Sequence, residues 1–368
     1  MPLWFATGKP GSVLVTLNWP LEHVSSVTVA IFERPPMQKP PPPSTIQGHA
    51  YAIYRPLAML AGMKLDVFTP LASGPMTVAE LGKTLAARPE KLNPLLYALV
   101  DANLLTVAEA RFSNTPEADA YLVKGRTTYM GSAHELYTDM WSAALGVAQS
   151  ISSGVPHARH DFSAMSDSEL GAFFRGLHAG AMATGRQLAT AYAFDRFQSL
   201  LDVGGGSGGV AIAACQSCET LRATVLELPR VAAIAKTFVE AASLTQRVDV
   251  VATDILAAPP GGKHDLAVLR YLLQVLSPDQ ARCALRNVGA ALQAGGELFM
   301  IGHVLDDTRL SPEAAVGMNL VFLSLYDDGQ SYTETEHRAW LEEAGFEDVS
   351  VHFGAGPNGA SIVRARKA

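Results

Sequence analysis

The stretch Phe197-Gln-Ser-Leu-Leu-Asp-Val-Gly-Gly-Gly-Ser-Gly-Gly209 decides the fold of this 368-residue chain. Its apolar residues predict a short buried strand that ends in a glycine turn, and residues 210–215 predict a helix that follows at once. Glycine lets the backbone turn sharply and approach a ligand without a Cβ in the way. The first turn of the helix has free N–H groups. The stretch therefore predicts a ligand site at the end of a strand.

The glycine spacing does not by itself identify the ligand. Gly204, Gly206 and Gly208 recur at every second position, but Gly204, Gly206 and Gly209 also match the dinucleotide pattern G-x-G-x-x-G. The residues that follow downstream have to decide between nucleotides.

Composition and charge limit the class of protein. The net charge of −7 argues against a general surface for nucleic acid or anionic membranes. No apolar run is long enough to span a bilayer, and no signal peptide is evident at the N-terminus. Three cysteines, an odd number, favour a reducing cytoplasm. Cys215 and Cys218 form a single C-x-x-C without a nearby histidine, so we expect no metal site.

The chain divides into four predicted regions. Residues 1–43 combine alternating valines, typical of strands, with a proline-rich linker. Residues 44–130 show a helix expected over 49–68, a capping box at Thr77-Val-Ala-Glu80, a further helix and a small hairpin, an order typical of a winged helix. Residues 131–193 are predicted to be helical and to contribute to a substrate pocket. Residues 194–368 form the last region.

In residues 194–368 strands alternate with helices, which predicts a mostly parallel sheet covered on both faces. The last two strands, over 346–353 and 360–366, are predicted to pair antiparallel. The expected fold class is thus α/β, a Rossmann-like domain preceded by an all-helical winged-helix-like region.

Three predicted strands end in acids: Asp202 before the glycine loop, Glu227 and Asp254. In an open parallel sheet the ligand lies outside the carboxyl ends of the strands. Glu227 suits the two hydroxyls of a ribose, which NAD and S-adenosylmethionine share. Asp254 can accept from an adenine amino group. The three acids together favour an adenosine-containing cofactor.

With its motifs taken together, the chain resembles the caffeic-acid and hydroxyindole type O-methyltransferases. The resemblance is carried by Asp202-Val-Gly-Gly-Gly-Ser-Gly208, Glu227-Leu-Pro229, Thr253-Asp254 and Ala344-Gly-Phe346, and it covers about residues 45–366. It implies a class I S-adenosylmethionine methyltransferase domain, a homodimer formed through the winged-helix region, and a small-molecule acceptor.

The resemblance also implies roles for individual residues. The glycine loop would hold the methionine portion of S-adenosylmethionine, and Glu227, followed by Leu228, would hold the ribose. Asp254 and Ile255 would face the adenine. Arg270 falls where the family usually has a basic residue.

The chain departs from the family at the general base. The family has a histidine after the fourth strand of the sheet, where this chain has Gln274, and an amide takes up no proton at neutral pH. Two carboxylates that usually flank the histidine are replaced by His303 and Ser331 by alignment. His303 is therefore the candidate for a relocated base.

Four hypotheses follow from this departure. They are O-methylation with His303 as base, C- or N-methylation of an acceptor that needs no strong base, a relative that binds the cofactor without methylating, and a ligand-responsive DNA-binding regulator. The last is disfavoured because the third helix of the winged-helix region has only Arg88 and Lys91 near its start. Aromatic and methionine residues at helical spacing are expected to line an apolar pocket for a flat aromatic or polyketide molecule; they are Trp141, Phe174, Met182, Met318, Phe322 and Tyr326.

Overall fold

The computed structural model describes residues 12–17, 27–32 and 40–368. The chain divides into two compact units, and the division falls after Ile53. The first unit contains β1 (Ser12–Leu17), β2 (Val27–Phe32) and α1 (Ser44–Tyr51). The two strands pair antiparallel from Ser12 opposite Phe32 to Leu17 opposite Val27, which confirms the strands predicted from the alternating valines. The predicted linker lies in part outside the described residues, because the description resumes only at Pro40.

The second unit, Tyr54–Ala368, begins with a small α+β region. Its helices are α2 (Tyr54–Lys64), α3 (Phe68–Leu71), α4 (Val78–Thr84), α5 (Pro89–Asp101) and α6 (Pro116–Leu122). Thr77 and Glu80 form the predicted capping box at the start of α4.

The hairpin predicted in this region is confirmed, because β4 (Leu105–Ala108) pairs antiparallel with β5 (Arg111–Asn114). The short β3 (Met76–Thr77) joins β5, so the region is mainly helical with a small sheet in the order β3-β5-β4, rather than all-helical. One sequence expectation for this region was wrong. A single helix over 49–68 is replaced by α1 and α2, with Ala52 and Ile53 between them. Pro56 has no N–H to donate to the carbonyl of Ala52, which weakens a continuous helix at this point.

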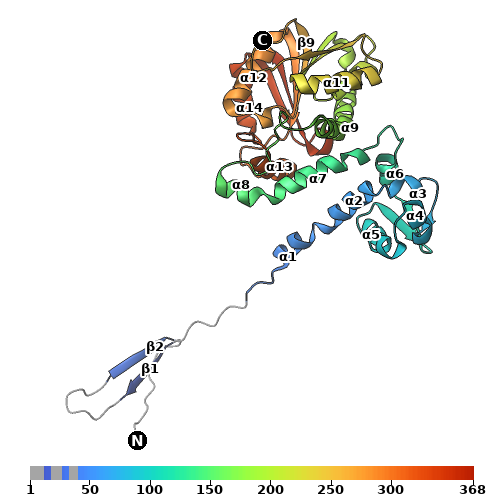
Figure 1. The fold of residues 1–368 in the computed structure, drawn as a ribbon. Coiled ribbons are helices and arrows are strands. Elements are labelled where there is room, and N and C mark those ends of the chain that lie inside the picture. The colour runs from blue at the N-terminus through green and yellow to red at the C-terminus, as the bar shows by residue number, and fades with distance from the viewer. Residues whose placement is uncertain (1–11, 18–26, 33–39) are drawn as a thin grey trace. The chain divides into compact units, whose positions relative to one another are not determined.

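The next helices are α7 (His134–Leu145), α8 (Val147–Ser153) and the long α9 (Asp167–Ala191). Ser166 and Glu169 form a capping box that starts α9. Far along the chain, α13 (Glu313–Leu325) packs against both α7 and α8 (Figure 1). These contacts bring residues of 134–153 together with residues near 320.

The predicted α/β domain is built on a seven-stranded sheet in the order β11-β12-β10-β9-β6-β7-β8. The strands are β6 (Ser199–Val203), β7 (Arg222–Glu227), β8 (Val248–Ala252), β9 (His264–Arg270), β10 (Leu292–Gly302), β11 (Phe346–His352) and β12 (Ser361–Lys367). Strands β6 to β10 run parallel, and β12 pairs antiparallel with β10 and β11. The predicted fold class of the domain is confirmed.

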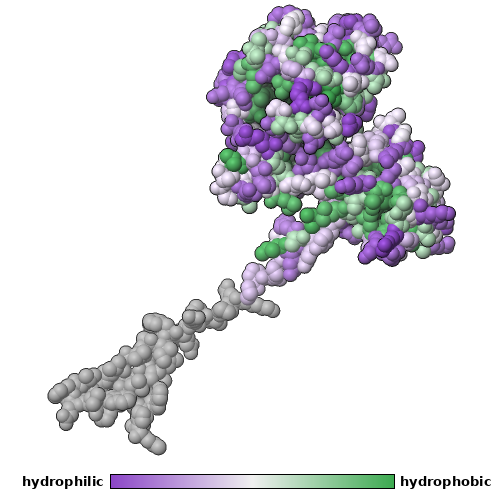
Figure 2. Space-filling view, in the orientation of Figure 1, coloured by the Kyte–Doolittle hydropathy of each residue, from purple (hydrophilic) through white to green (hydrophobic). Residues whose placement is uncertain are grey.

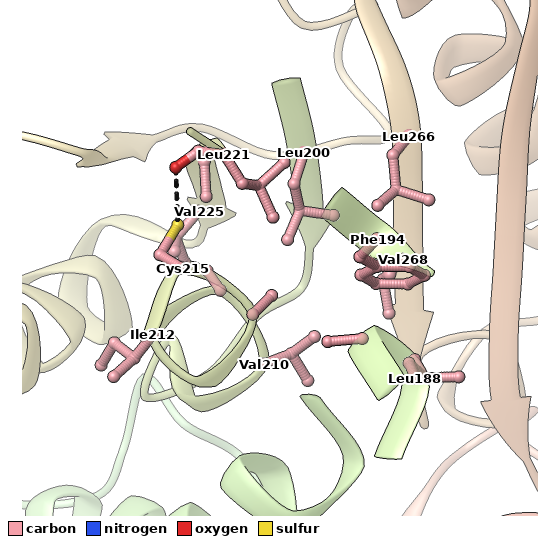
Figure 3. Close-up of a cluster of buried hydrophobic side chains, with 14 of the residues drawn as sticks. Leu188, Phe194, Leu200, Val210, Ile212, Cys215, Leu221, Val225, Leu266 and Val268 are labelled. Carbon is pink, nitrogen blue, oxygen red and sulfur yellow. Dashed lines mark hydrogen bonds between the residues drawn. The ribbon is translucent and has the colours of Figure 1, made fainter. Parts of the chain in front are cut away.

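Alternating residues of the central strands bury two separate cores. Leu200 belongs to the core that α9 and α10 (Gly209–Ser217) cover, whereas Leu201 and Val203 belong to the core on the opposite face. The opposite face is covered by α12 (Pro278–Ala291) and α14 (Glu334–Glu343), and α11 (Pro229–Ala241) follows β7. Figure 3 shows the first core, where Val210 of α10 lies between the strand residues and Leu188 of α9, and Ile212 lies on the other side of α10.

Helices α9 and α10 approach each other closely because glycines lie at their contact. A Cβ on Gly185 would come within 2.6 Å of the Val210 carbonyl oxygen, and one on Gly209 within 2.7 Å of the Ala181 Cβ. The close contact places α9 directly against the start of α10, where the glycine loop ends.

Candidate active site

The glycine loop between β6 and α10 has the backbone that its sequence predicts. Gly204, Gly206 and Gly208 all have positive φ, at 62°, 59° and 71°. The intervening Gly205 is required by space, since a Cβ there would lie 2.8 Å from Val225 Cγ1. The loop therefore turns tightly and leaves a cradle that side chains of its own do not fill.

Asp202 lies behind the loop and does not project out of it. Its side chain is fully buried, and Oδ2 accepts a hydrogen bond of 3.1 Å from the Ala211 N–H in the first turn of α10. Burial raises the pKa of Asp202 to about 7, against the effect of the Ala211 N–H. Oδ1 is buried without a partner among the described residues. Asp202 thus holds the start of α10 and keeps one oxygen with unused hydrogen-bonding capacity.

Glu227, the last residue of β7, reaches back to the glycine loop. Its Oε2 accepts from the Gly206 N–H at 2.9 Å, and Oε1 accepts from the Leu228 N–H at 2.8 Å. Burial raises the pKa of the Glu227 carboxyl, and the charge of Asp254 acts in the same direction. Each carboxylate oxygen can accept more than one hydrogen bond, so Glu227 can bind the loop and a diol together.

The structure separates the two residues predicted to face an adenine. Asp254 is exposed two positions past the end of β8, and its Oδ1 accepts from the Leu256 N–H at 2.9 Å. The Ile255 side chain is instead buried in the second core, with a relative exposure of 6%. Of this pair, the Asp254 carboxylate is the group accessible at the edge of the sheet.

Arg270, at the end of β9, points toward α9. Its Nε donates to Thr184 Oγ1 at 3.1 Å, and its guanidinium carbon lies 4.5 Å from the centre of the Tyr271 ring. Burial lowers the pKa of Arg270, and the nearby Tyr271 and Asp202 oppose this. Arg270 therefore links the sheet to α9 close to Asp202.

Gln274 and His303 lie next to each other, as the alignment of their positions predicted. Gln274 Oε1 accepts from the backbone N–H of His303 at 3.1 Å. Both line a cavity of about 20 Å³, room for a single water molecule, together with Tyr271 and Gly302. Gln274 is thus engaged in holding the end of β10.

The His303 imidazole is a poor proton acceptor. Burial, and after it the charge of Arg270, lowers the pKa of His303 from its ordinary 6.5 to about 4. Its Nδ1 is buried with no partner in the described part of the chain, and its ring lies 5.3 Å from the Tyr271 ring. His303 is neutral at physiological pH. The role of His303 as a relocated base stays a prediction, which this lowered pKa disfavours.

The predicted pocket residues fall in several places. Met318, Phe322 and Tyr326 gather on α13, and the Phe322 ring lies 6.0 Å from the His303 ring. Phe174 lies against the glycine loop, where a Cβ on Gly206 would be 3.1 Å from its ring. Two residues do not join them: Trp141 stacks on Tyr137, and Met182 packs against the first core.

The sequence analysis missed the side chains that connect these groups. Tyr326 is followed by His160 at 5.8 Å, His160 by Phe173 at 5.2 Å, and Phe173 by Phe174 at 5.3 Å between ring centres. We call this series, from Tyr271 through His303, Phe322, Tyr326, His160 and Phe173 to Phe174, the aromatic row. No periodic signal could have found it, because its members come from the ends of two strands, from a loop, from α9 and from α13 with its C-terminal cap.

Two further features concern the part of the chain that the structure describes. There, no three or more His, Cys, Asp or Glu side chains gather in a way that could hold a metal ion. No described helix combines the length and the apolar character needed to cross a membrane.

Comparison with known families decides what this site belongs to. The model of an O-methyltransferase domain matches residues 134–347, and that of an O-methyltransferase dimerisation domain matches residues 48–124. The chain belongs to the O-methyltransferase family. It is an S-adenosylmethionine-dependent methyltransferase, and the dinucleotide alternative for the glycine loop is set aside.

Individual relatives span almost the whole chain. A 3-hydroxy-5-methyl-1-naphthoate 3-O-methyltransferase of Streptomyces sahachiroi is 29% identical and covers 89% of this chain and 96% of its own length. The tetracenomycin polyketide synthesis 8-O-methyl transferase TcmO of Streptomyces glaucescens is 27% identical, with coverage of 88% and 96%. The structure of human N-acetylserotonin methyltransferase in complex with SAM has the same fold, with a TM-score of 0.78, 24% identity and coverage of 90% and 99%.

The residues of this methyltransferase fit its cofactor. The cradle at Gly204–Gly208 would be filled by any Cβ, Asp202 Oδ1 has no partner among the described residues, and Glu227 keeps free acceptor positions beside the loop. The roles of the individual residues remain our proposal.

We predict that Glu227→Ala weakens binding of S-adenosylhomocysteine by about 1.5–3 kcal/mol, the contribution of hydrogen bonds to a charged group. Isothermal titration calorimetry measures this directly. Glu240→Ala, an exposed acid at the far end of α11, is the control and should bind like the wild type. Unchanged affinity in Glu227→Ala would remove Glu227 from the cofactor site.

We predict that His303 makes the protein less stable in acid. Because its folded pKa of about 4 lies below the unfolded value of 6.5, the unfolded chain binds the proton first, and stability falls as the pH drops from 6.5 to 4. The loss from this group is on the order of 3 kcal/mol. Urea unfolding measures the free energy of unfolding, which should fall less between pH 7 and pH 4.5 in His303→Gln than in the wild type. Equal losses in both proteins would contradict the assignment, and the exposed His157→Gln serves as control.

Proposed function

We propose that this enzyme transfers the methyl group of S-adenosylmethionine to a hydroxyl oxygen of a flat aromatic or polyketide-like small molecule, and that it does so as a homodimer. The aromatic row is the observation that carries the proposal. It begins beside the glycine loop, where Phe174 lies against Gly206, and ends at His303 and Tyr271. Ring faces and edges of this kind favour a planar aromatic acceptor.

The relatives support the same class of acceptor. The names of two of them specify a hydroxynaphthoate and a tetracenomycin polyketide, both with transfer to oxygen. A third relative, 27% identical over 80% of this chain, is named an N,N-dimethyltransferase. Transfer to nitrogen or carbon is therefore the second candidate, favoured by the loss of the family's base at Gln274.

Separate groups of residues would bind the methyl donor and the acceptor. When bound, S-adenosylmethionine supplies an electrophilic methyl group. Gly204, Gly206 and Gly208 would admit its methionine portion, Glu227 and Leu228 its ribose, and Asp254 its adenine. Phe174 and Phe322, at two points of the aromatic row, would hold the acceptor in place and exclude water. Holding donor and acceptor in line supplies a large part of the rate enhancement.

A hydroxynaphthoic acid and the matching naphthoic acid without the hydroxyl group test the proposal. With S-adenosylmethionine present, mass spectrometry should find a methyl ether of the first compound and no methylated product of the second. Methylation on carbon, methylation of an aromatic amine in preference to the hydroxyl, or no transfer to a panel of hydroxynaphthoates and hydroxyanthraquinones would contradict it. Binding of S-adenosylhomocysteine without any methyl transfer would favour the relative that does not methylate.

The homodimer rests on the dimerisation domain and on an apolar surface. Leu57 and Leu65 of the α2 region and Tyr97 of α5 are 44%, 47% and 50% exposed. Figure 2 shows hydrophobic colour gathered over these helices. Exposed apolar groups of this density are typical of a protein interface. The cytoplasmic location expected from the cysteines stays a prediction.

We predict that the protein is a dimer at micromolar concentration and that Leu57→Glu converts it to a monomer, because a charge would be buried in the interface. Multi-angle light scattering measures both states. Leu310→Glu is the control, since Leu310 is 80% exposed in a loop outside the dimerisation domain, and it should remain dimeric. A monomeric wild type, or a dimeric Leu57→Glu, would place the interface elsewhere.

A further inference from the structure

His160 and Asp139 form a pair that neither the sequence motifs nor the family's base position indicates. His160 lies in the loop between α8 and α9, and its Nε2 is 2.7 Å from Oδ2 of Asp139 on α7. The backbone N–H of His160 also donates to the Leu325 carbonyl at 3.0 Å, at the end of α13. Contacts to α7 and α13 thus fix both the backbone and the ring of this histidine.

The other ring nitrogen of His160 has unused hydrogen-bonding capacity. The side chain is only 4% exposed, and its Nδ1 is buried without a partner among the described residues. A neutral imidazole whose Nε2–H donates to a carboxylate has Nδ1 as an unprotonated acceptor. The carboxylate selects this tautomer and stabilises the imidazolium that forms when Nδ1 takes up a proton.

The groups around His160 leave Asp139 as its ionic partner. Phe173 from α9 and Tyr326 from the end of α13 meet the ring edge to face, and Phe162 lies 6.3 Å away. Burial, followed by the charge of Asp139, raises the pKa of the Tyr326 phenol to about 12, so that it stays protonated. Arg159, beside His160 in sequence, pairs with Asp327 at the exposed surface.

The His160–Asp139 pair lies where it could supply the general base that Gln274 cannot supply. His160 occupies the middle of the aromatic row, between Tyr326 and Phe173, and two rings separate it from the glycine loop at Gly206. Gln274 takes up no proton, and His303 has no carboxylate partner among the described residues and a pKa of about 4. Of the two histidines in the aromatic row, His160 is the one whose ring contacts a carboxylate.

We propose that the His160–Asp139 pair is the general base of this enzyme, with Nδ1 of His160 accepting the proton of the acceptor hydroxyl. The proposal rests on the proposed transfer to a hydroxyl oxygen. As the O–H bond breaks, the proton moves to Nδ1, and a lone pair of the oxygen forms the bond to the methyl carbon. The methyl–sulfur bond breaks with its electron pair on sulfur. The resulting imidazolium is balanced by the Asp139 carboxylate on Nε2. Nδ1 gives its proton to water once the methylated product has left, which restores the starting tautomer.

Four variants and two acceptors test the proposal: His160→Gln, Asp139→Asn, the control His157→Gln and the rival His303→Gln, each with a hydroxynaphthoic acid and with 4-nitrophenol at about pH 9. The first acceptor needs a base, whereas 4-nitrophenol is already ionised at that pH. For the hydroxynaphthoic acid, we expect kcat to fall about 10²–10⁴-fold in His160→Gln and substantially in Asp139→Asn, while the control His157→Gln changes little. With 4-nitrophenol the losses in His160→Gln and Asp139→Asn should largely disappear. His303→Gln removes a ring of the aromatic row, so any loss that it causes should be equal with both acceptors.

Two readouts besides activity separate a base from a structural histidine. Affinity for S-adenosylhomocysteine, measured by calorimetry, should stay within about twofold in every variant, since the pair is proposed to act on the acceptor hydroxyl. In the wild-type protein, ¹⁵N-histidine NMR should show His160 with Nε2 protonated and Nδ1 bare, and Asp139→Asn should disturb this tautomer.

The outcomes that overturn the proposal are distinct. Wild-type turnover in His160→Gln, an equal loss with both acceptors, or a protonated Nδ1 in the wild type would each refute the pair as base while leaving O-methylation intact. A wild-type enzyme that forms no methyl ether at all would refute the proposed function, and the base with it. If His160→Gln fails to fold, Asp139→Asn and the wild-type NMR spectrum still decide the question.

Discussion

The site depends on a tight backbone turn that carboxylates hold from two sides. Three glycines with positive φ let the chain leave β6 and enter α10 within a few residues, and this turn presents backbone N–H groups in place of side chains. Asp202 accepts from the first turn of α10, and Glu227 accepts from the Gly206 N–H. The same acids that bind the loop therefore set the shape and the charge of the cofactor side of the site.

The sheet, its helices and the glycine turn could be predicted from the sequence because each is encoded locally. Apolar runs that end in glycine or acid mark the parallel strands, and Thr77, Ser277 and Thr333 mark helix starts by their capping boxes. Burial depends on neighbours that the sequence does not name. Ile255 follows an exposed acid in the sequence, yet its apolar side chain is buried in the second core, because burial of apolar surface is favourable.

The acceptor side was predicted less well, for a physical reason. It is assembled by helix packing: α13 lies against α7 and α8, and the loop before α9 is bound to the end of α13 through the Leu325 carbonyl. A periodic pattern shows that Trp141 and Phe322 each face a neighbour, but it does not show which one. Phe322 faces His303, whereas Trp141 stacks on Tyr137 of its own helix. Contacts such as that of His160 with Asp139 join residues on separate elements. The spacing of residues along the sequence does not predict such contacts.

The contrast between His303 and His160 shows how environment decides the chemistry of one residue type. Both rings belong to the aromatic row, and both have a buried Nδ1 with no partner among the described residues. His303 lies near the cationic Arg270 and receives only ring contacts, so its charged form is disfavoured twice, by burial and by repulsion. His160 has a carboxylate at hydrogen-bond distance on its opposite nitrogen. A proton on His303 would be an uncompensated buried charge, whereas one on His160 would complete an ion pair. Proton transfer in this acceptor site is therefore directed toward α7, away from the strand end where the family's base position lies.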